Sequence, residues 1–356
     1  MVLAMNAKSA VSNSIHKFPY RWNLTDLAEV KKNGLKVFSC FSCGGGSSMG
    51  YKLAGFDVIG NCEIDHDMQK VYLANNHPIY PFTMDLRDFN KSDVPEELIG
   101  IDVLDGSPPC SVFSTAGKRE EKWGGEYSFR EGQAKQRLDD LFFVYSDTVQ
   151  KLQPKVFVAE NVKGLLVGKA KGYVREIVDR FREIGYSVQV FLLNAAVMGV
   201  PQARERVFFI GRRNDLKLPQ VNLDFREKPI LFGEARSEHG SDKPLTKRQM
   251  EIMSQRKKGD RNFSAILRRQ ADSNTRFGDI IAVDDRVMTT IKSTGLYLRD
   301  CDGKPFSKQD FVTCQTFPQD YSFGKQSVQY VCGMSVPPVM MAQIAKQIQI
   351  QIFGIN

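Results

Sequence analysis

A single cysteine stands in a stiff loop where an apolar run gives way to polar sequence. Cys110 follows Pro108 and Pro109 in the segment DGSPPCSVFS, and the apolar residues 101–104 just before it predict a short buried strand. Each proline fixes its own φ and restricts the residue before it, so the loop presents the thiol rigidly. The pattern fits a nucleophile at the end of a strand, and it also fits a proline-rich turn that carries a buried cysteine.

Two further segments place reactive groups next to predicted strands. Glu160 directly follows the apolar residues 155–159, and Arg204 and Arg206 directly precede the apolar residues 207–210. Ligands of an open α/β sheet bind at the carboxyl ends of its parallel strands, so we expect these side chains to share a rim with Cys110. A carboxyl there can exchange protons, and a guanidinium can stabilise a thiolate.

A glycine-rich loop indicates a nucleoside-containing ligand. A strand at 35–38 leads into FSCGGGSSMG, residues 41–50, and then into a short helix that ends near Gly55. Such a loop brings backbone N–H groups and a helix N-terminus to the ligand. Glu63 ends the next strand, 58–62, where an acidic residue typically binds ribose hydroxyls, and Asp85 ends the third. The glycines do not spell G-x-G-x-x-G, which disfavours a nicotinamide dehydrogenase.

The order of predicted elements specifies the fold. Strands at 155–159, 187–193 and 207–210 accompany helices at 139–152 and 172–184. Strand and helix alternate, which predicts an α/β fold with a doubly wound, mostly parallel, Rossmann-like sheet. The polar residues 115–136 are predicted to form a moving lid beside the site. An apolar stripe after residue 338 predicts a final helix packed on the core.

Charge and composition narrow the range of possible functions. The 356-residue chain has a formal net charge of +8, and residues 226–299 hold 16 Lys and Arg against 10 Asp and Glu. This concentration indicates a polyanion-binding surface, although a solvated basic face would look the same. The seven scattered cysteines predict neither disulfides nor a metal site. No apolar run reaches membrane-spanning length, and no signal peptide is evident, so we expect a cytoplasmic protein without membrane contact.

Over nearly all of residues 35–350, these segments resemble the cytosine-C5 DNA methyltransferases. The resemblance rests on GSPPC with Phe113 and Ser114, on ENV at 160–162, on QARER at 202–206, on the glycine loop, on QTFP at 315–318 and on GMSVPP at 333–338. Cys43 replaces the first glycine of the family's F-x-G-x-G-G loop and is expected to be strained if that position has a positive φ. Met334 replaces an asparagine, and Thr313 and Cys314 replace an Arg-Leu pair.

The resemblance implies a DNA (cytosine-5-)-methyltransferase that acts on a cytosine flipped out of a specific duplex sequence. The thiolate of Cys110 would attack C6 of the base. Glu160 would contact N3 and the exocyclic amine and supply a proton, and Arg204, in one motif with Arg206, would stabilise the thiolate and hold O2. S-adenosyl-L-methionine would donate the methyl group, and its expected binding residues are Phe41, Gly45, Gly46, Glu63, Ile64, Asp85, Leu86, Leu141, Ser335 and Val336.

The resemblance also implies a division of the chain and a set of partners. Residues 1–34 form an extension, residues 35–221 with 328–356 a catalytic and cofactor-binding domain, residues 222–300 a small basic target-recognition domain, and residues 301–327 a hinge. Lys, Arg, Asn and Gln are the residues that read bases in the major groove. The expected DNA contacts are Lys118, Arg119, Lys257, Lys258, Arg261, Arg268 and Arg269. We expect a nucleoid-associated monomer that modifies double-stranded DNA, with a restriction endonuclease as a functional partner.

Alternative interpretations remain open at this point. A tRNA cytosine-5 methyltransferase uses the same motifs, and a catalytically silent DNA-binding homologue would keep the same fold. Phe41, Ile64 and Leu141 are also consistent with ordinary core residues.

Overall fold

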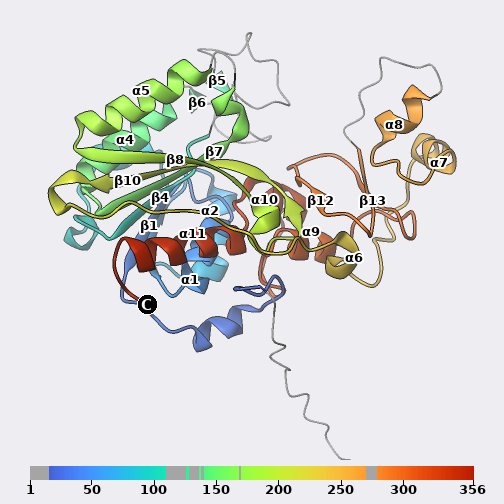
Figure 1. Ribbon diagram of the computed structural model, residues 1–356, viewed down its shortest axis with the longest axis horizontal. Coiled ribbons are helices and arrows are strands. Elements are labelled where there is room, and N and C mark those ends of the chain that lie inside the picture. Colours follow the sequence, from blue (N-terminus) through green and yellow to red (C-terminus); the bar gives the residue numbers. More distant parts are fainter. Residues whose placement is uncertain (1–15, 110–125, 128–135, 138–139, 168–169, 270–278) are drawn as a thin grey trace, which may run out of the picture.

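A seven-stranded sheet forms the centre of the molecule (Figure 1). In the computed structural model, which describes residues 16–109, 126–127, 136–137, 140–167, 170–269 and 279–356, the strand order is β3-β2-β1-β4-β7-β10-β8. The strands are β1 (Lys36–Cys40), β2 (Asp57–Cys62), β3 (Tyr80–Phe82), β4 (Val103–Gly106), β7 (Val156–Val162), β8 (Tyr186–Asn194) and β10 (Glu205–Arg213).

The sheet is mostly parallel, as predicted. β1 pairs in parallel with β2 and β4, β2 pairs with β3, and β4 pairs with β7. Only β10 runs the other way, antiparallel to β7 and β8. It is longer than the predicted strand at 207–210, because it pairs with β8 along Glu205–Arg213 and with β7 along Arg206–Arg212, and these ranges include its polar ends. This reversal brings the start of β10 to the carboxyl end of β7.

Alternate residues of the strands face two separate hydrophobic cores. Val37, Val103 and Val158 point into one core, whereas their neighbours Phe38, Leu104 and Phe157 point into the other. This is the period-two consequence of strand geometry, and it explains why the strands are apolar on both faces. Helices α1 (Gly46–Leu53) and α11 (Pro338–Gln351) cover the first face, and α3 (Leu86–Lys91), α4 (Leu141–Leu152) and α5 (Ala170–Glu183) cover the second.

The large lobe contains several further elements. They comprise α2 (His66–Asn76), β9 (Gln202–Ala203), the strand pair β5 (Glu126–Tyr127) and β6 (Gln136–Arg137), and the 3-10 helices η1 (Leu24–Glu29), η2 (Glu96–Leu98), η4 (Lys163–Leu166), η5 (Ala195–Val197) and η6 (Asn214–Leu216). β5 and β6 pair antiparallel within the segment predicted as a lid, most of which lies outside the described residues.

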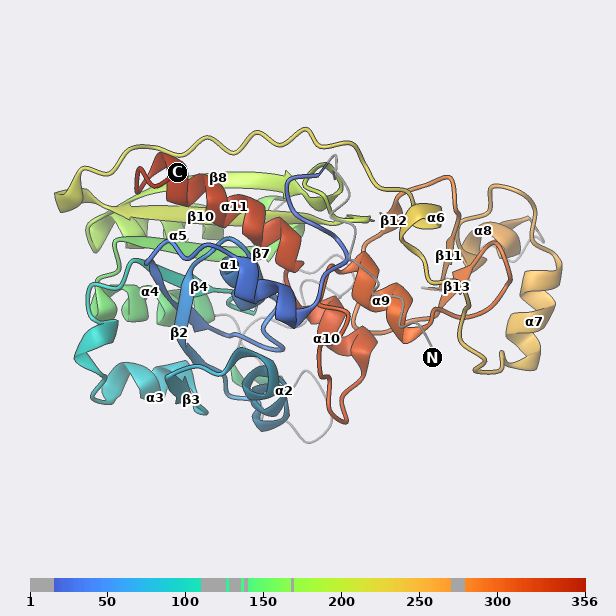
Figure 2. The ribbon, with the colours of Figure 1, turned by 90° about the horizontal axis from the view of Figure 1, so that it is seen from below.

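A smaller lobe lies beside the carboxyl ends of the parallel strands (Figure 2). It contains α6 (Phe232–Ala235), α7 (Lys247–Ser254), α8 (Phe263–Arg268), β11 (Ile280–Ala282), β12 (Met288–Thr289) and β13 (Tyr297–Arg299). Phe263, Ile266, Ile281 and Leu298 form part of its own small core. β12 pairs with β9, so the lobe is joined by a strand ladder to the segment just before β10.

The chain then returns to the large lobe through α9 (Lys308–Cys314) and α10 (Val328–Met334). The final helix predicted after residue 338 is α11, and Pro338 occupies its first turn. Among the residues that the structure describes, no helix has the length and apolarity needed to cross a membrane.

Candidate active site

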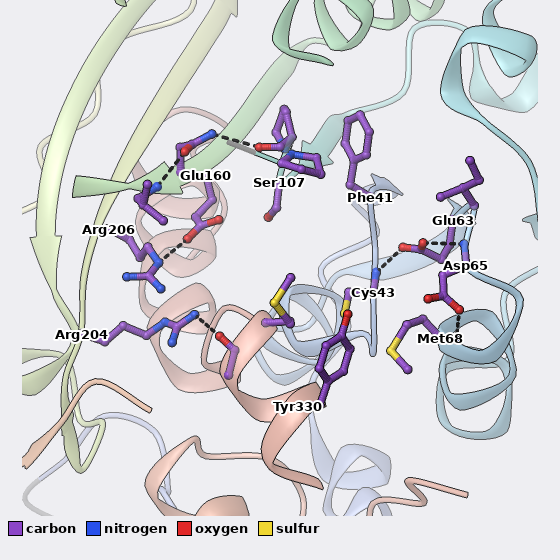
Figure 3. A pocket seen from close by; sticks show the side chains of 17 residues that line it. Phe41, Cys43, Glu63, Asp65, Met68, Ser107, Glu160, Arg204, Arg206 and Tyr330 are labelled. Atoms are coloured by element: carbon purple, nitrogen blue, oxygen red, sulfur yellow. Dashed lines mark hydrogen bonds and ion pairs between the residues drawn. The ribbon is translucent and has the colours of Figure 1, made fainter. Parts of the chain in front are cut away.

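Glu160 and Arg206 form an ion pair at the end of β7 (Figure 3). Arg206 Nε lies 2.9 Å from Glu160 Oε1, and the two side chains are only 14% and 12% exposed. The antiparallel register explains the pairing, because Phe208 lies opposite Glu160 and Arg206 opposite Val162. A guanidinium so placed holds the carboxyl in one orientation. Burial lowers the pKa of Arg206, although the charge of Glu160 opposes that effect.

The proline loop reaches the same cavity. Ser107, Pro108 and Pro109 line it together with Glu160 and Arg206. Asn161 Nδ2 donates a hydrogen bond of 3.0 Å to the carbonyl oxygen of Pro108, so the residue after Glu160 anchors the loop. Cys110, the predicted nucleophile, lies just beyond Pro109 and outside the described residues.

Arg204 lies in the same cavity wall but has different partners. Its two terminal nitrogens each donate 3.0 Å hydrogen bonds, one to the carbonyl oxygen of Ile291 and the other to that of Gly333. The side chain is buried, and its Nε has no partner among the described residues. Burial, reinforced by the charge of Arg206, lowers the pKa of Arg204 to about 9. The cation paired with Glu160 is therefore Arg206, and Arg204 links three chain segments.

The glycine loop turns through residues with positive φ. Phe41 has φ 52°, Cys43 has φ 46° and Gly45 has φ 85°. A non-glycine residue in this region is strained, so Cys43 adopts the conformation that makes its replacement of a glycine unfavourable. Gly46 is required for a different reason, since a Cβ there would lie 2.4 Å from the carbonyl oxygen of Val336.

Glu63 is held against the turn of this loop. Its carboxylate accepts hydrogen bonds from the backbone N–H groups of Cys43, at 2.7 Å, and Asp65, at 2.8 Å. Burial raises the pKa of Glu63 to about 7, despite these two backbone donors. The thiol of Cys43 stays protonated at neutral pH, because burial and the charge of Glu63 raise its pKa to about 12.

The predicted cofactor residues border three adjoining cavities. Phe41, Glu63 and Ile64 line the largest, together with the proline loop and Glu160. Asp85 and Leu86 line a smaller one beside Phe41 and Ile64, and Gly46, Ser335 and Val336 line a third. Asp85 also caps α3 and pairs with Arg87 at 3.1 Å.

Two predicted cofactor residues lie deeper. Gly45 packs against Asn76, Tyr72 and Tyr321, where a side chain would clash. Leu141 is 1% exposed in the hydrophobic core beneath α4 and does not line these cavities.

The predicted DNA contacts have unequal surroundings. Lys257, Lys258, Arg261, Arg268 and Arg269 are all exposed on the small lobe. Arg269 is held by Asp260, with Nη2 to Oδ2 at 2.7 Å, and also donates to the carbonyl oxygen of Gln255. Lys118 and Arg119 lie outside the described residues.

Several residues of the site were not predicted from the sequence. Met68 and Tyr330 line the main cavity from α2 and α10, outside the motifs named above. Asp105 is buried at the end of β4 and lines the third cavity. A carboxylate in a strand that is otherwise apolar was the available signal for Asp105.

A glycine loop after β1, an acidic residue after β2 and an ion pair at the end of β7 line one cavity at the edge of a mostly parallel sheet, in an α/β fold of the methyltransferase type. Residues 35–350 match the model of the C-5 cytosine-specific DNA methylase family. The chain belongs to this family.

Individual relatives agree with this assignment. The chain is 35% identical over 190 residues to the type II methyltransferase M.NgoPII of Neisseria gonorrhoeae, covering 52% of this chain and 50% of the relative. The chain spans about half the length of M.NgoPII and of two further type II methyltransferases that it matches at the same identity. It is 28% identical to M.HindV of Haemophilus influenzae, covering 88% and 96% of the two chains.

Solved structures show the same fold. The structure of a putative DNA modification methyltransferase encoded within an Escherichia coli prophage superposes with a TM-score of 0.63 at 21% identity, covering 89% of this chain and 99% of that one. The structure of Spodoptera frugiperda DNMT2 gives a TM-score of 0.61 at 17% identity, covering 88% and 99%.

Proposed function

We propose that this protein is a DNA (cytosine-5-)-methyltransferase that modifies a flipped-out cytosine in a specific duplex sequence. One observation carries the proposal: the Glu160–Arg206 pair, the proline loop, the glycine loop and Glu63 all line one cavity. The residues proposed to bind the base, Glu160 and Arg206, thus line the same cavity as Glu63, which is proposed to bind the cofactor.

The cofactor that fits this cavity is S-adenosyl-L-methionine, which supplies an electrophilic methyl group when bound. Glu63 would accept hydrogen bonds from the ribose hydroxyls, and Phe41 and Ile64 would pack against the adenine. Asp85 and Leu86 border the neighbouring cavity and would meet the edge of the adenine. Gly46, Ser335 and Val336 would enclose the methionyl end.

The chemistry then follows from the protein's own groups. The thiolate of Cys110 forms a bond to C6 of cytosine, and C5 becomes nucleophilic as the ring takes up negative charge. Glu160 protonates N3, held in place by Arg206. After C5 has gained the methyl group, its proton passes to water and the electrons of the S–C6 bond leave with sulfur, which restores the C5=C6 double bond and the Cys110 thiolate. The proton on N3 returns to Glu160, so both protein groups end in their starting states.

The basic lobe would supply the DNA contacts. Lys257, Lys258 and Arg261 are exposed on it, and phosphate contacts by such residues can offset the cost of flipping a base, roughly a few kcal/mol. We assign residues 222–300 to target recognition and 301–327 to the connection between the lobes. The similarity to type II methyltransferases makes a companion restriction endonuclease the expected functional partner.

Transfer of labelled methyl groups to duplex DNA and to tRNA tests the proposal. We expect label in DNA, and label in tRNA alone would instead identify an RNA methyltransferase. DNA that contains 5-fluorocytosine should trap a covalent adduct with the wild-type protein, since fluorine at C5 blocks elimination. The Cys110→Ala variant should form no adduct, and a protein that binds DNA without any adduct would be a silent homologue. Bisulfite sequencing of DNA from expressing cells would read the target.

A further inference from the structure

Asp105 is a buried carboxylate with an unused oxygen. It lies at the end of β4, 2% exposed, opposite Ser39 of β1 in the parallel register. The hydroxyls of Ser39 and Ser47 both donate to its Oδ2 at 2.8 Å. Within the described part of the chain, its Oδ1 has no hydrogen-bond partner.

This arrangement is costly for the protein alone. A buried carboxyl with an unpaired oxygen loses the hydrogen bonds that water would give it. The hydroxyl of Tyr51 lies close enough to Asp105 to lower the pKa of this carboxyl by hydrogen bonding. Neither this hydroxyl nor Oδ1 has a partner within 3.5 Å and good hydrogen-bond geometry among the described residues, so Tyr51 is the competing neighbour for the unpaired oxygen. Burial and the negative charge of Glu160 raise the pKa of Asp105 to about 7.

The carboxylate borders the cavity assigned above to the methionyl end of the cofactor. Asp105, Ser39 and Ser47 line this cavity together with Gly46, Ser335 and Val336. Phe41, Cys43, Ser107 and Met334 line both this cavity and the main one, so the two adjoin. Asp105 therefore stands next to the proposed cofactor, on a strand that carries none of the cofactor residues predicted from the sequence.

The surroundings match an amino-acid zwitterion. The first turn of α1, which begins at Gly46, leaves backbone N–H groups without intrahelical partners and so favours a carboxylate. Asp105 supplies the opposite charge beside Ser47 of the same turn. A ligand that carries an ammonium and a carboxylate on one carbon is complementary to this pair.

We propose that Asp105 is a cofactor-binding residue that accepts the α-ammonium group of S-adenosylmethionine, with Ser39 and Ser47 fixing its carboxylate. The proposal rests on the function proposed above. The alternative is a structural role, in which Asp105 accepts hydrogen bonds only from the hydroxyls of Ser39, Ser47 and Tyr51.

Binding calorimetry with three ligands separates these two roles. The ligands are S-adenosylhomocysteine, its analogue without the α-amino group, and 5′-methylthioadenosine, which lacks the whole amino-acid end. In Asp105→Asn we expect the affinity for S-adenosylhomocysteine to fall by roughly ten- to a hundredfold, the range for the loss of a charge-assisted hydrogen bond. The affinities for the other two ligands should stay within about twofold, and they also report that the variant is folded.

Two matched variants complete the design. Glu63→Gln removes a different carboxylate of the same site, and it should weaken all three ligands to a similar degree because all three carry the ribose. Ser47→Ala keeps the charge of Asp105 and should reduce the binding of S-adenosylhomocysteine by less than Asp105→Asn does.

The possible outcomes are distinct. If Asp105→Asn weakens all three ligands equally, or none of them, Asp105 does not bind the ammonium group. If the wild-type protein binds none of the three, the proposed function itself is wrong.

Discussion

Asn161 donates a hydrogen bond to the carbonyl oxygen of Pro108, and it directly follows Glu160 in β7. One strand end therefore both presents the carboxyl of Glu160 to the main cavity and holds the loop that leads to Cys110. In the proposed mechanism, Asn161 therefore positions the loop that precedes Cys110, and its neighbour Glu160 is the acid.

Replacing Asn161 should separate catalysis from stability. In Asn161→Ala the loop loses its anchor, and we expect kcat to fall by about ten- to a hundredfold with unchanged affinity for S-adenosylhomocysteine. Asn90→Ala is the matched control, because Asn90 Nδ2 donates to the carbonyl oxygen of Val144 at 3.0 Å away from these cavities. It should cost similar stability, about 1–3 kcal/mol, and leave kcat unchanged. Equal kcat losses in both variants would refute the anchoring role.

The ion pair at the rim should be sensitive to the shape of the cation. Arg206→Lys keeps the charge but loses the planar guanidinium that orients Glu160. We expect a lower kcat with little change in cofactor affinity, measured by steady-state methyl transfer and by calorimetry. A variant with wild-type kcat would show that the orientation of Glu160 does not depend on Arg206.

The strained loop makes a prediction about stability. Cys43 has φ 46°, a conformation that costs a non-glycine residue about 1–2 kcal/mol and that a β-branched residue tolerates least. Cys43→Gly should therefore unfold at no lower urea concentration than the wild type, whereas Cys43→Val should be destabilised by at least about 1 kcal/mol. Cys43→Ala serves as the control for loss of the thiol. A more stable valine variant would contradict this account of the turn.

The buried carboxyls should make the stability of the free protein depend on pH. Burial raises the pKa of Asp105 and that of Glu63 to about 7, from ordinary values near 4. Between these values the folded chain keeps protons that the unfolded chain releases. Their contribution to stability is therefore greatest below pH about 4 and is lost as the pH rises through about 7. Asp105→Asn should gain stability relative to the wild type between pH 5 and pH 8, measured by urea unfolding.

Ligand binding should show the opposite trend. An ionised Asp105 is needed to pair with an ammonium group, so the affinity for S-adenosylhomocysteine should rise between pH 6 and pH 8, and the rise should be smaller in Asp105→Asn. The titratable groups that interact with Asp105 are Tyr51, Tyr145, Cys40, Tyr72 and Glu160. The three tyrosines and Cys40 stay neutral in this range, because burial raises the pKa of each above its ordinary value. An affinity that falls with pH would contradict the charge pairing.

Neighbouring basic residues of the small lobe are expected to have different roles. The double variant Lys257→Ala/Lys258→Ala should weaken binding to every DNA duplex and flatten the dependence of affinity on salt by about one unit of slope for each phosphate interaction that it removes. Arg269→Ala should instead destabilise the lobe, because Arg269 is held by Asp260. Fluorescence anisotropy at several salt concentrations, together with thermal unfolding, distinguishes the two effects. An unchanged salt slope in the double lysine variant would remove these residues from the DNA surface.

Local sequence was sufficient to predict the sheet and to predict that Glu160, Arg204 and Arg206 lie at one edge of it. The strands at 155–159 and 207–210 are apolar on both faces, which is the signature of a sheet covered on two sides, and the helices α4 and α5 follow a helical apolar period. The observed ends of the strands differ from the predicted ends because backbone pairing continues beyond the apolar residues, as in β10.

Long-range partners were not predictable from local patterns. Nothing in QARER indicates that Arg206 faces Glu160 while Arg204 faces the carbonyl oxygens of Ile291 and Gly333. That choice follows from the antiparallel register of β10 and from the path of the small lobe. The unpaired oxygen of Asp105 likewise depends on how β1, β4 and α1 meet in space.

The two carbonyl hydrogen bonds of Arg204 connect Ile291 of the small lobe to Gly333, which lines the main cavity. The backbone at Lys292 and Ser293 passes so close to Gly333 that a Cβ at Gly333 would lie 2.3 Å from the amide nitrogen of Ser293. Arg204 thus bridges the interface between the lobes. Loss of activity in an Arg204 variant would therefore have two explanations, a displaced small lobe or a lost interaction with the base. A structure of the variant is needed to decide between them.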